Sequence, residues 1–242
     1  MKFIKIGKHT IFFEPGEHKF TDERGNSVNS VTKFTGVIDK SQQLIWWAVK
    51  LMKNFLLDII EAGGSISQAH LEEAYKLHSV KKKEAGDIGT AIHELVSKWI
   101  KKEKYDIPDD DRVRNGFNAF LEFQRQQKIK WLVSEEIVGY LADEKILFAG
   151  IADAVAKING KLVLVDFKSS NGLYDEHYFQ TAAYQMAWEQ MHKKKIAYRL
   201  LARFGKDDGS FEFMELHEND RDKKAFLACV DLKNRLIEIR KK

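Results

Sequence analysis

Two apolar segments joined by Asn159-Gly160 constrain the fold of this 242-residue chain more than any other feature. The first runs from Ile146 to Ile158 and the second from Lys161 to Lys168. Because Asn-Gly is the dipeptide favoured by a type I′ turn, the two segments predict a β-hairpin. The polar run from Ser169 to Gly172 then ends the second strand. The residues just before that run are therefore expected at the C-terminal end of a strand, where open α/β sheets usually hold their ligands.

Asp166 and Lys168 are predicted to leave the same face of the second strand. They alternate with Val165 and Phe167, and residues two apart in a strand point to the same side. Asp153, on the first strand of the hairpin, is expected to approach Asp166. Two ionised carboxylates about 4 Å apart repel by roughly 4 kcal/mol at an effective dielectric of about 20, so the pair needs a cation or a shared proton. Oxygen ligands of this kind suit Mg²⁺ or Mn²⁺.

Two helical patterns carry further polar side chains. The segment from Glu176 to Lys193 predicts an amphipathic helix, on which Gln180 and Tyr184 stand four residues apart and share one side. Upstream, the run from Gly89 to His93 lies in another helical pattern, with its histidine at the edge of the apolar stripe. Taken alone, such a histidine is more often a core residue, and an Asp-x-Lys triplet is more often a solvated strand pair.

Taken together and in this order, the four groups resemble the motifs of the PD-(D/E)XK nuclease superfamily, specifically its RecB-like branch. That branch is marked by G-x-x-x-H, G-x-x-D, D-x-K and Q-x-x-x-Y, which correspond here to Gly89 to His93, Gly150 to Asp153, Asp166 to Lys168 and Gln180 to Tyr184. The resemblance implies a restriction-endonuclease-like α/β core, with a mixed central sheet flanked by helices. It covers the catalytic core, whereas residues 1 to about 80 resemble only phage-type members, and loosely.

The resemblance also implies roles for individual residues. His93, Asp153 and Asp166 would be metal ligands, joined by the backbone carbonyl of Phe167, with Mg²⁺ or Mn²⁺ as the cofactor. Lys168 would be the catalytic lysine. It would either take a proton from the attacking water or stay charged and stabilise the transition state, and the sequence does not decide between these roles.

Further polar residues are expected near this cleft. By the same resemblance, Gln180 and Tyr184 would face the nucleic acid. Either Glu135 or Glu136 can point into the cleft from the preceding strand, but strand phase does not choose between them, and an exposed strand carboxylate is the alternative. The remaining histidines have no partner spacing that makes them metal ligands; they are His9, His18, His70, His78, His177, His192 and His217.

The cysteine content separates this chain from several relatives in that branch, which hold an iron–sulfur cluster with four cysteines. Cys229 is the only cysteine in the sequence, so neither such a cluster nor an intramolecular disulfide can form. A single cysteine fits a reducing compartment. No signal peptide or membrane-spanning run is recognisable, so we expect a cytoplasmic protein without a membrane partner.

The chain is expected to form a nuclease core over residues 81–242 and an N-terminal extension of strands and helices over residues 1–80. The helices of residues 41–80 carry more apolar surface than a simple cap requires. Trp46 and Trp47 are adjacent and cannot both face one core. We therefore expect this extension to cover the cleft.

The resemblance thus implies a metal-dependent DNA nuclease, most simply an exonuclease that acts on DNA ends or single strands in phage or bacterial DNA processing or recombination. The alternative is a catalytically inactive nucleic-acid-binding or scaffold protein on a nuclease fold. The intact His93, Asp153, Asp166 and Lys168 favour the enzyme. The sequence has no Walker A pattern, so a helicase or recombinase partner would be a separate chain.

Overall fold

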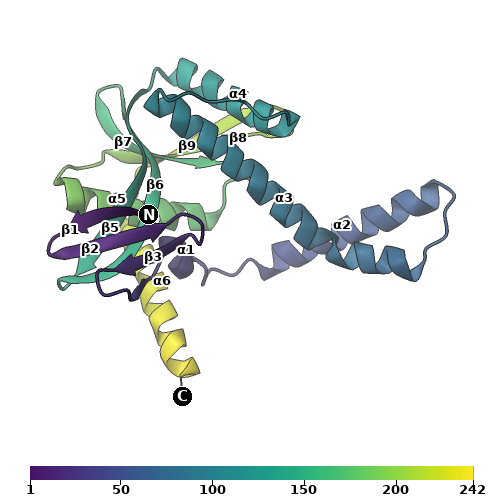
Figure 1. Ribbon diagram of the computed structural model, residues 1–242, viewed down its shortest axis with the longest axis horizontal. Helices are drawn as coiled ribbons and strands as arrows, with labels where there is room; N and C mark the ends of the chain where they lie inside the picture. The colour runs from purple at the N-terminus through teal and green to yellow at the C-terminus, as the bar shows by residue number, and fades with distance from the viewer. Residues whose placement is uncertain (242) are drawn as a thin grey trace. The chain divides into compact units, whose positions relative to one another are not determined.

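The computed structural model describes residues 1–241 of the chain. These residues divide into two compact units, one formed by Met1–Ile38 and Ile92–Lys242 and the other by Asp39–Ala91. The first unit holds both β-sheets (Figure 1). The second holds one whole helix and part of the next.

A mixed sheet lies at the centre of the first unit. Within the described residues its five strands follow the order β5-β6-β7-β8-β9. These strands are β5 (Lys130–Ala142), β6 (Lys145–Ile158), β7 (Lys161–Lys168), β8 (Tyr198–Phe204) and β9 (Phe211–Leu216). Only the β7–β8 pair is parallel among them, and the crossover that a parallel pair requires is made by α5 (Asp175–His192). This arrangement confirms the predicted restriction-endonuclease-like core, a mixed sheet flanked by helices.

The hairpin that constrained the fold is present as predicted. Asn159 and Gly160 both adopt positive φ angles, 50° and 78°, between β6 and β7. A type I′ turn requires positive φ at both central residues, which Asn and Gly tolerate best. The turn fixes the register of the two strands, and this register sets which residues meet at their other end.

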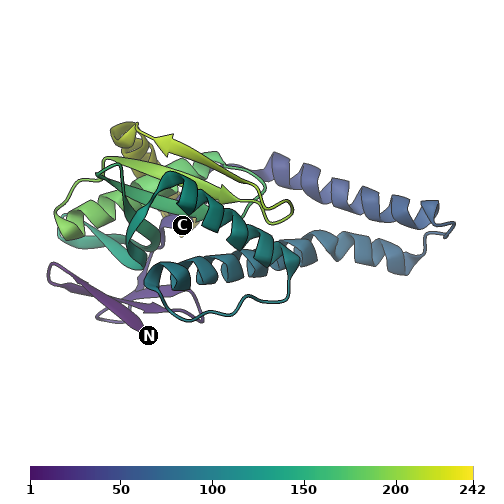
Figure 2. The ribbon, with the colours of Figure 1, turned by 90° about the horizontal axis from the view of Figure 1, so that it is seen from above.

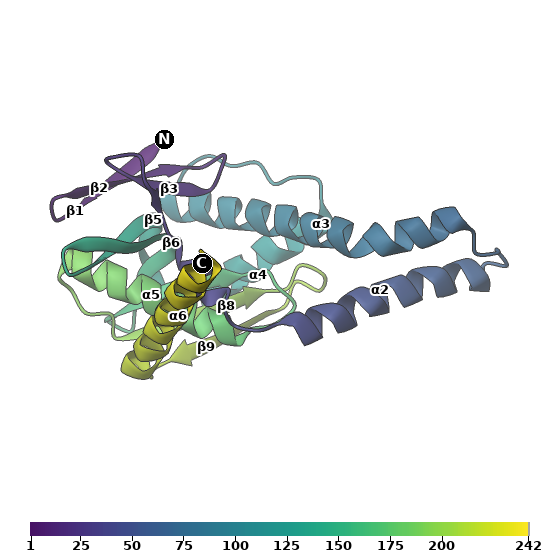
Figure 3. The same ribbon diagram turned by 90° about the horizontal axis from the view of Figure 1, so that it is seen from below.

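Helices cover the two faces of the central sheet. On one face, Leu164 of β7 is buried with Ala183 and Ala187 of α5. On the opposite face, the Phe167 ring meets Phe120 of α4 (Asp111–Gln127), with ring centres 5.9 Å apart. Successive residues of a strand point to opposite faces, so one strand contributes to both layers. The last helix, α6 (Asn219–Arg240), packs against α5 (Figures 2 and 3).

A smaller antiparallel sheet precedes the central one in sequence. It consists of β1 (Lys2–Ile6), β2 (His9–Glu14), β3 (Lys19–Asp22) and β4 (Ser27–Val28), in that order. Ile11 and Phe20 of this sheet form a buried cluster with Ile137 of β5 and Ala149 of β6. A short helix, α1 (Val31–Thr35), follows and is buried against the central core. The first 38 residues are therefore part of the same compact unit as the central sheet.

The second unit contains α2 (Ser41–Glu61) and the first part of α3 (Gln68–Lys101). No residue of α2 is buried in the described structure, and Trp46 is 71% exposed whereas Trp47 is half-buried. The boundary expected near residue 80, between the N-terminal extension and the nuclease core, lies inside α3, which is one continuous helix. Cover of the cleft by this region stays a prediction. Among residues 1–241, no helix combines the length and the hydropathy that crossing a membrane requires.

Candidate active site

Three carboxylates stand in a row across neighbouring strands of the central sheet. The register of β5 with β6 places Glu135 opposite Asp153. The register of β6 with β7, extended by one residue, places Asp153 opposite Asp166. Directly opposed residues share one face of a sheet, on strands about 5 Å apart. All three residues line one pocket, together with His93 of α3. The sheet therefore gathers acidic groups that are up to 31 positions apart in the sequence.

Asp153 connects the middle of this row to the other motifs. Its Oδ2 accepts a hydrogen bond from the Phe167 backbone N–H at 2.8 Å, and its Oδ1 lies 3.7 Å from His93 Nδ1. Burial raises the pKa of Asp153, but His93, the Lys168 charge and the Phe167 N–H together outweigh burial, so the net shift is downward. Burial lowers the pKa of His93, but the charge and hydrogen bond of Asp153, with the Asp166 charge, together raise it overall. The His93 side chain is 31% exposed, so it lies at the pocket rather than in the core.

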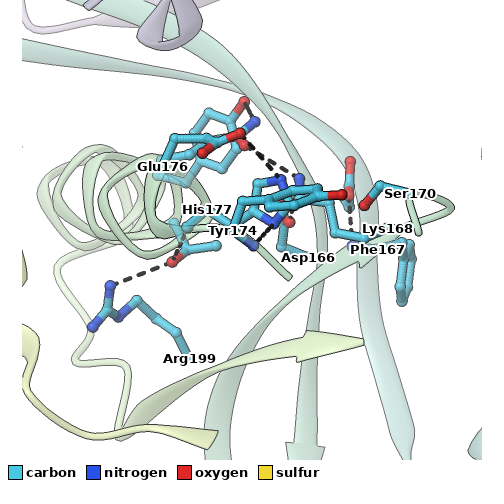
Figure 4. Close-up of polar contacts among 12 residues, drawn as sticks. Asp166, Phe167, Lys168, Ser170, Tyr174, Glu176, His177 and Arg199 are labelled. Carbon is cyan, nitrogen blue, oxygen red and sulfur yellow. Dashed lines mark hydrogen bonds and ion pairs between the residues drawn. The ribbon is translucent and has the colours of Figure 1, made fainter. Parts of the chain in front are cut away.

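Asp166 and Lys168 form the closest ion pair of the pocket. Lys168 Nζ lies 2.6 Å from Asp166 Oδ2 at the end of β7 (Figure 4). The Asp166 side chain is only 1% exposed, and this burial raises its pKa to about 6 despite the ammonium beside it. Burial lowers the pKa of Lys168, but the charges of Asp166 and Asp153 outweigh this effect and hold the pKa above its ordinary value. The lysine is therefore a charged donor.

The two α5 residues of the Q-x-x-x-Y motif hold Lys168 in place. Lys168 Nζ donates to Gln180 Oε1 at 3.2 Å, and Gln180 Nε2 donates to the Tyr184 hydroxyl at 2.9 Å. Tyr184 is 6% exposed, and its ring packs against Gly150. In the described structure, Gln180 thus contacts the lysine directly, whereas Tyr184 contacts Gln180 through its hydroxyl group.

A buried arginine fixes the position of α5 on the sheet. Arg199 of β8 has no exposed surface and donates from Nη1 to the Tyr178 carbonyl of α5 at 2.7 Å (Figure 4). Its Nη2 pairs with Asp222 of α6. At the start of α5, the Tyr174 backbone N–H donates to His177 Nδ1 at 3.1 Å. The contacts to Tyr178 and His177 anchor the first two turns of α5, which carries Gln180, and the Asp222 pair holds Arg199 against α6.

Glu135 and Glu136 have different surroundings. Glu135 lines the pocket and lies 3.3 Å from Lys101 Nζ, with a φ of 51° that turns its backbone into the left-handed region. Glu136 instead accepts hydrogen bonds from Trp188 Nε1 and His192 Nε2 of α5, at 2.9 and 2.8 Å. The structure therefore places Glu135, and not Glu136, beside Asp153.

Five residues of the pocket had no signal in the sequence. They come from the turn before β3, from β3 and from the start of α1, and they are His18, Phe20, Ser30, Val31 and Thr32. They share no motif with the four groups that mark the site. The packing of the small sheet on β5 and β6 brings them to the pocket. Neither hydrophobic periodicity nor motif spacing in the sequence predicts that contact.

Comparison with known proteins agrees with this geometry. The family model of the PD-(D/E)XK nuclease superfamily matches residues 66–240, which is more than half of the chain. The chain belongs to this superfamily. A comparison with curated proteins finds no match.

Two solved structures are similar at low identity. SSO0001 is 16% identical over 51% of this chain and 59% of its own, with a TM-score of 0.35. This chain therefore aligns with less than two thirds of SSO0001. LHK-Exo, solved in complex with dAMP, is 12% identical over 88% of this chain and 89% of its own, with a TM-score of 0.43.

PD-(D/E)XK nucleases generally use divalent metal ions. Within residues 1–241 no three His, Cys, Asp or Glu side chains stand close enough together to hold an ion as they are placed. The carboxylates are turned to other partners, Asp166 to Lys168 and Asp153 to the Phe167 N–H. The residues nevertheless fit such an ion, because burial makes the Asp166 charge unfavourable and a second carboxylate faces it. Oxygen donors with one imidazole suit Mg²⁺ or Mn²⁺.

Proposed function

We propose that this chain is a metal-dependent deoxyribonuclease whose active site is the pocket around Asp166 and Lys168. The observation that carries the proposal is the 2.6 Å contact between these two side chains, in one pocket with Asp153 and His93. A pair of carboxylates can bind a divalent cation, and the adjacent ammonium then remains available to a phosphate. Both groups favour the hydrolysis of a phosphodiester, because both offset the negative charge on its oxygens.

Four groups would hold the cation. They are the side chains of Asp153, Asp166 and His93 and the backbone carbonyl of Phe167. A divalent cation, when bound, polarises a phosphodiester and makes a water molecule more acidic. Asp153 and His93 already face each other at 3.7 Å, whereas Asp166 would have to leave Lys168.

Lys168 would stabilise charge rather than remove a proton. Its pKa is held above the ordinary value by the neighbouring carboxylates, so the ammonium stays charged at neutral pH. Besides Asp166, Gln180 holds Lys168 Nζ, with its Oε1 at 3.2 Å, and this contact would remain if Asp166 bound a cation. A charged donor fixed at that distance can offset the negative charge that develops on the phosphate oxygens in the transition state.

The finer assignment follows the motif order. The order G-x-x-x-H, G-x-x-D, D-x-K, Q-x-x-x-Y supports placement in the RecB-like branch and an exonuclease that acts on DNA ends or single strands. Such an activity fits phage or bacterial DNA processing or recombination. A helicase or recombinase that works with it would be a separate chain.

Digestion of end-labelled linear and circular DNA, single- and double-stranded, tests this function. The reactions contain Mg²⁺, Mn²⁺ or EDTA. We expect cleavage with either ion and none with EDTA, and we expect linear single strands to disappear much faster than circles of equal length. Equal rates on circles would move the assignment to an endonuclease. Binding without cleavage under every condition would instead make the chain an inactive nucleic-acid-binding protein.

A further inference from the structure

One wall of the active-site pocket comes from a part of the chain that the superfamily match does not include. The match begins at residue 66, yet His18, Phe20, Ser30 and Thr32 line the same pocket as Asp153. The small N-terminal sheet therefore contributes to the site that the motif residues build. We call these four residues the N-terminal wall.

The N-terminal wall is held firmly against the central sheet. Phe20 is 2% exposed and packs on Phe13 with ring centres 4.8 Å apart. Further along the chain, the Ala149 N–H of β6 donates to the Asn29 carbonyl at 3.0 Å, next to the bridge that pairs Ser30 with Ala149. This attachment lies one residue before Gly150 of the G-x-x-D motif. The wall and the motif are thus fixed to each other through the β6 backbone.

His18 lies at the end of the turn between β2 and β3. Its φ of 49° lies in the left-handed region, where His, like Asn and Asp, is found more often than most other side chains with a Cβ. The ring meets that of Phe13 edge-on, with centres 5.3 Å apart and an interplanar angle of 90°. Within the described residues its ring nitrogens form no hydrogen bond. Because the side chain is exposed beside the pocket, a ring N–H donor is available to a ligand.

The hydroxyl groups of the wall also retain a donor. Ser30 Oγ accepts from the Lys33 N–H at 3.3 Å and lies 3.1 Å from Thr32 Oγ1. One hydroxyl proton is used between the two side chains, so the other remains for a ligand. The carboxylates that line the same pocket, Glu135, Asp153 and Asp166, come from β5, β6 and β7. The pocket therefore combines acidic groups of the central sheet with uncharged donors of the N-terminal wall.

This combination matches a phosphodiester. A cation held by the carboxylates would take some of the phosphate oxygens, and the remaining oxygens need hydrogen-bond donors. We propose that the N-terminal wall binds a phosphate of the substrate strand, with the His18 ring N–H donating to a non-bridging oxygen. The proposal rests on the nuclease function proposed above and extends the substrate-binding residues beyond the superfamily motifs.

The variant His18→Phe separates hydrogen bonding from packing. It keeps an aromatic ring to stack on Phe13 and removes the N–H donor. For cleavage of a linear oligonucleotide, we expect KM to rise about tenfold with kcat and Mn²⁺ affinity unchanged, since a hydrogen bond to a charged oxygen is lost from substrate binding. His18→Gln, which restores an amide N–H, should recover part of the loss.

His217→Phe is the matched control. His217 also lies against an aromatic ring, that of Tyr198 at 5.1 Å, and it is not among the residues that line the active-site pocket. This variant should cleave like the wild type. An unchanged KM for His18→Phe, or a loss of Mn²⁺ affinity in parallel with KM, would overturn the proposed phosphate contact. A wild-type protein that cleaves nothing would overturn the nuclease function itself, and this inference with it.

Discussion

The ring of Tyr184 occupies the space that a side chain at Gly150 would need. A Cβ built on Gly150 would lie 2.5 Å from Tyr184 Cε1 and 3.2 Å from Val31 Cγ2. The first glycine of G-x-x-D and the last residue of Q-x-x-x-Y are therefore one packing unit. Through the Tyr184 hydroxyl and Gln180, this unit reaches the Lys168 ammonium.

Gly150→Ala should therefore displace the tyrosine and disturb the lysine. We expect the variant to lose about 1–3 kcal/mol of unfolding free energy, as overpacking in a filled core does. Its kcat should also fall, because Gln180 loses its support. Urea unfolding and cleavage assays measure the two effects. Gly16→Ala is the control, since a Cβ there meets nothing within 4 Å. A Gly150→Ala variant as stable and active as this control would show that the contact between Gly150 and Tyr184 contributes to neither stability nor activity.

Asp166→Ala and Lys168→Ala should both abolish cleavage, for different reasons. Loss of Asp166 removes a ligand and should weaken Mn²⁺ binding, whereas loss of Lys168 should spare metal binding and remove transition-state stabilisation of several kcal/mol. Calorimetric titration with Mn²⁺ distinguishes the variants. If both lose metal affinity equally, the roles assigned to the two residues are wrong.

His93→Ala should lower Mn²⁺ affinity with little effect on the metal-free fold. The side chain is 31% exposed, so its removal leaves little cavity, and we expect a loss within about 1 kcal/mol. Its neighbour Ile92 is 1% exposed, and Ile92→Ala should cost about 2–5 kcal/mol. Thermal unfolding of the metal-free proteins compares them. A His93→Ala variant as unstable as Ile92→Ala would favour a core histidine.

Glu189, near the end of α5, gives the fold a pH dependence. Burial raises its pKa, but hydrogen bonds from Gln185 and the Ile196 N–H, with the Lys223 charge, bring it below 4.5 overall. A carboxyl whose pKa falls on folding stabilises the protein above its unfolded pKa, and the stability is lost as pH falls through the folded value. Between about pH 7 and pH 3, Tm should thus fall less in Glu189→Gln than in the wild type. Exposed Glu17→Gln is the control, and identical slopes in all three proteins would contradict this role.

The elements of the core could be predicted because their signals are local. Asn159-Gly160 specifies its own turn, and the alternation around Asp166 specifies a strand, so the hairpin and the shared face of Asp166 and Lys168 followed from neighbouring residues. The sequence indicated that Glu135 or Glu136 can enter the pocket, but it could not decide between them. The place of Glu135 depends on a left-handed backbone and on the register of β5, which only the folded sheet defines.

The other features that the sequence did not predict depend on contacts between distant segments of the chain. Nothing in the sequence near His18 indicates that it lines a pocket with Asp153, because the packing of two sheets brings them together. The same holds for Tyr184, where four-residue spacing indicates a shared helix face and the sequence does not identify Gly150 as its contact.

Cleavage by Lys168→Ala tests the central claim most directly. The matched control is Lys161→Ala, an exposed lysine at the start of the same strand. Initial rates on an end-labelled linear single strand, at saturating Mn²⁺, should be equal for the wild type and the control. They should be at least about 100-fold lower for Lys168→Ala, the scale expected when a donor to the transition state is removed. Wild-type rates in Lys168→Ala would contradict the assignment of this pocket as the nuclease active site.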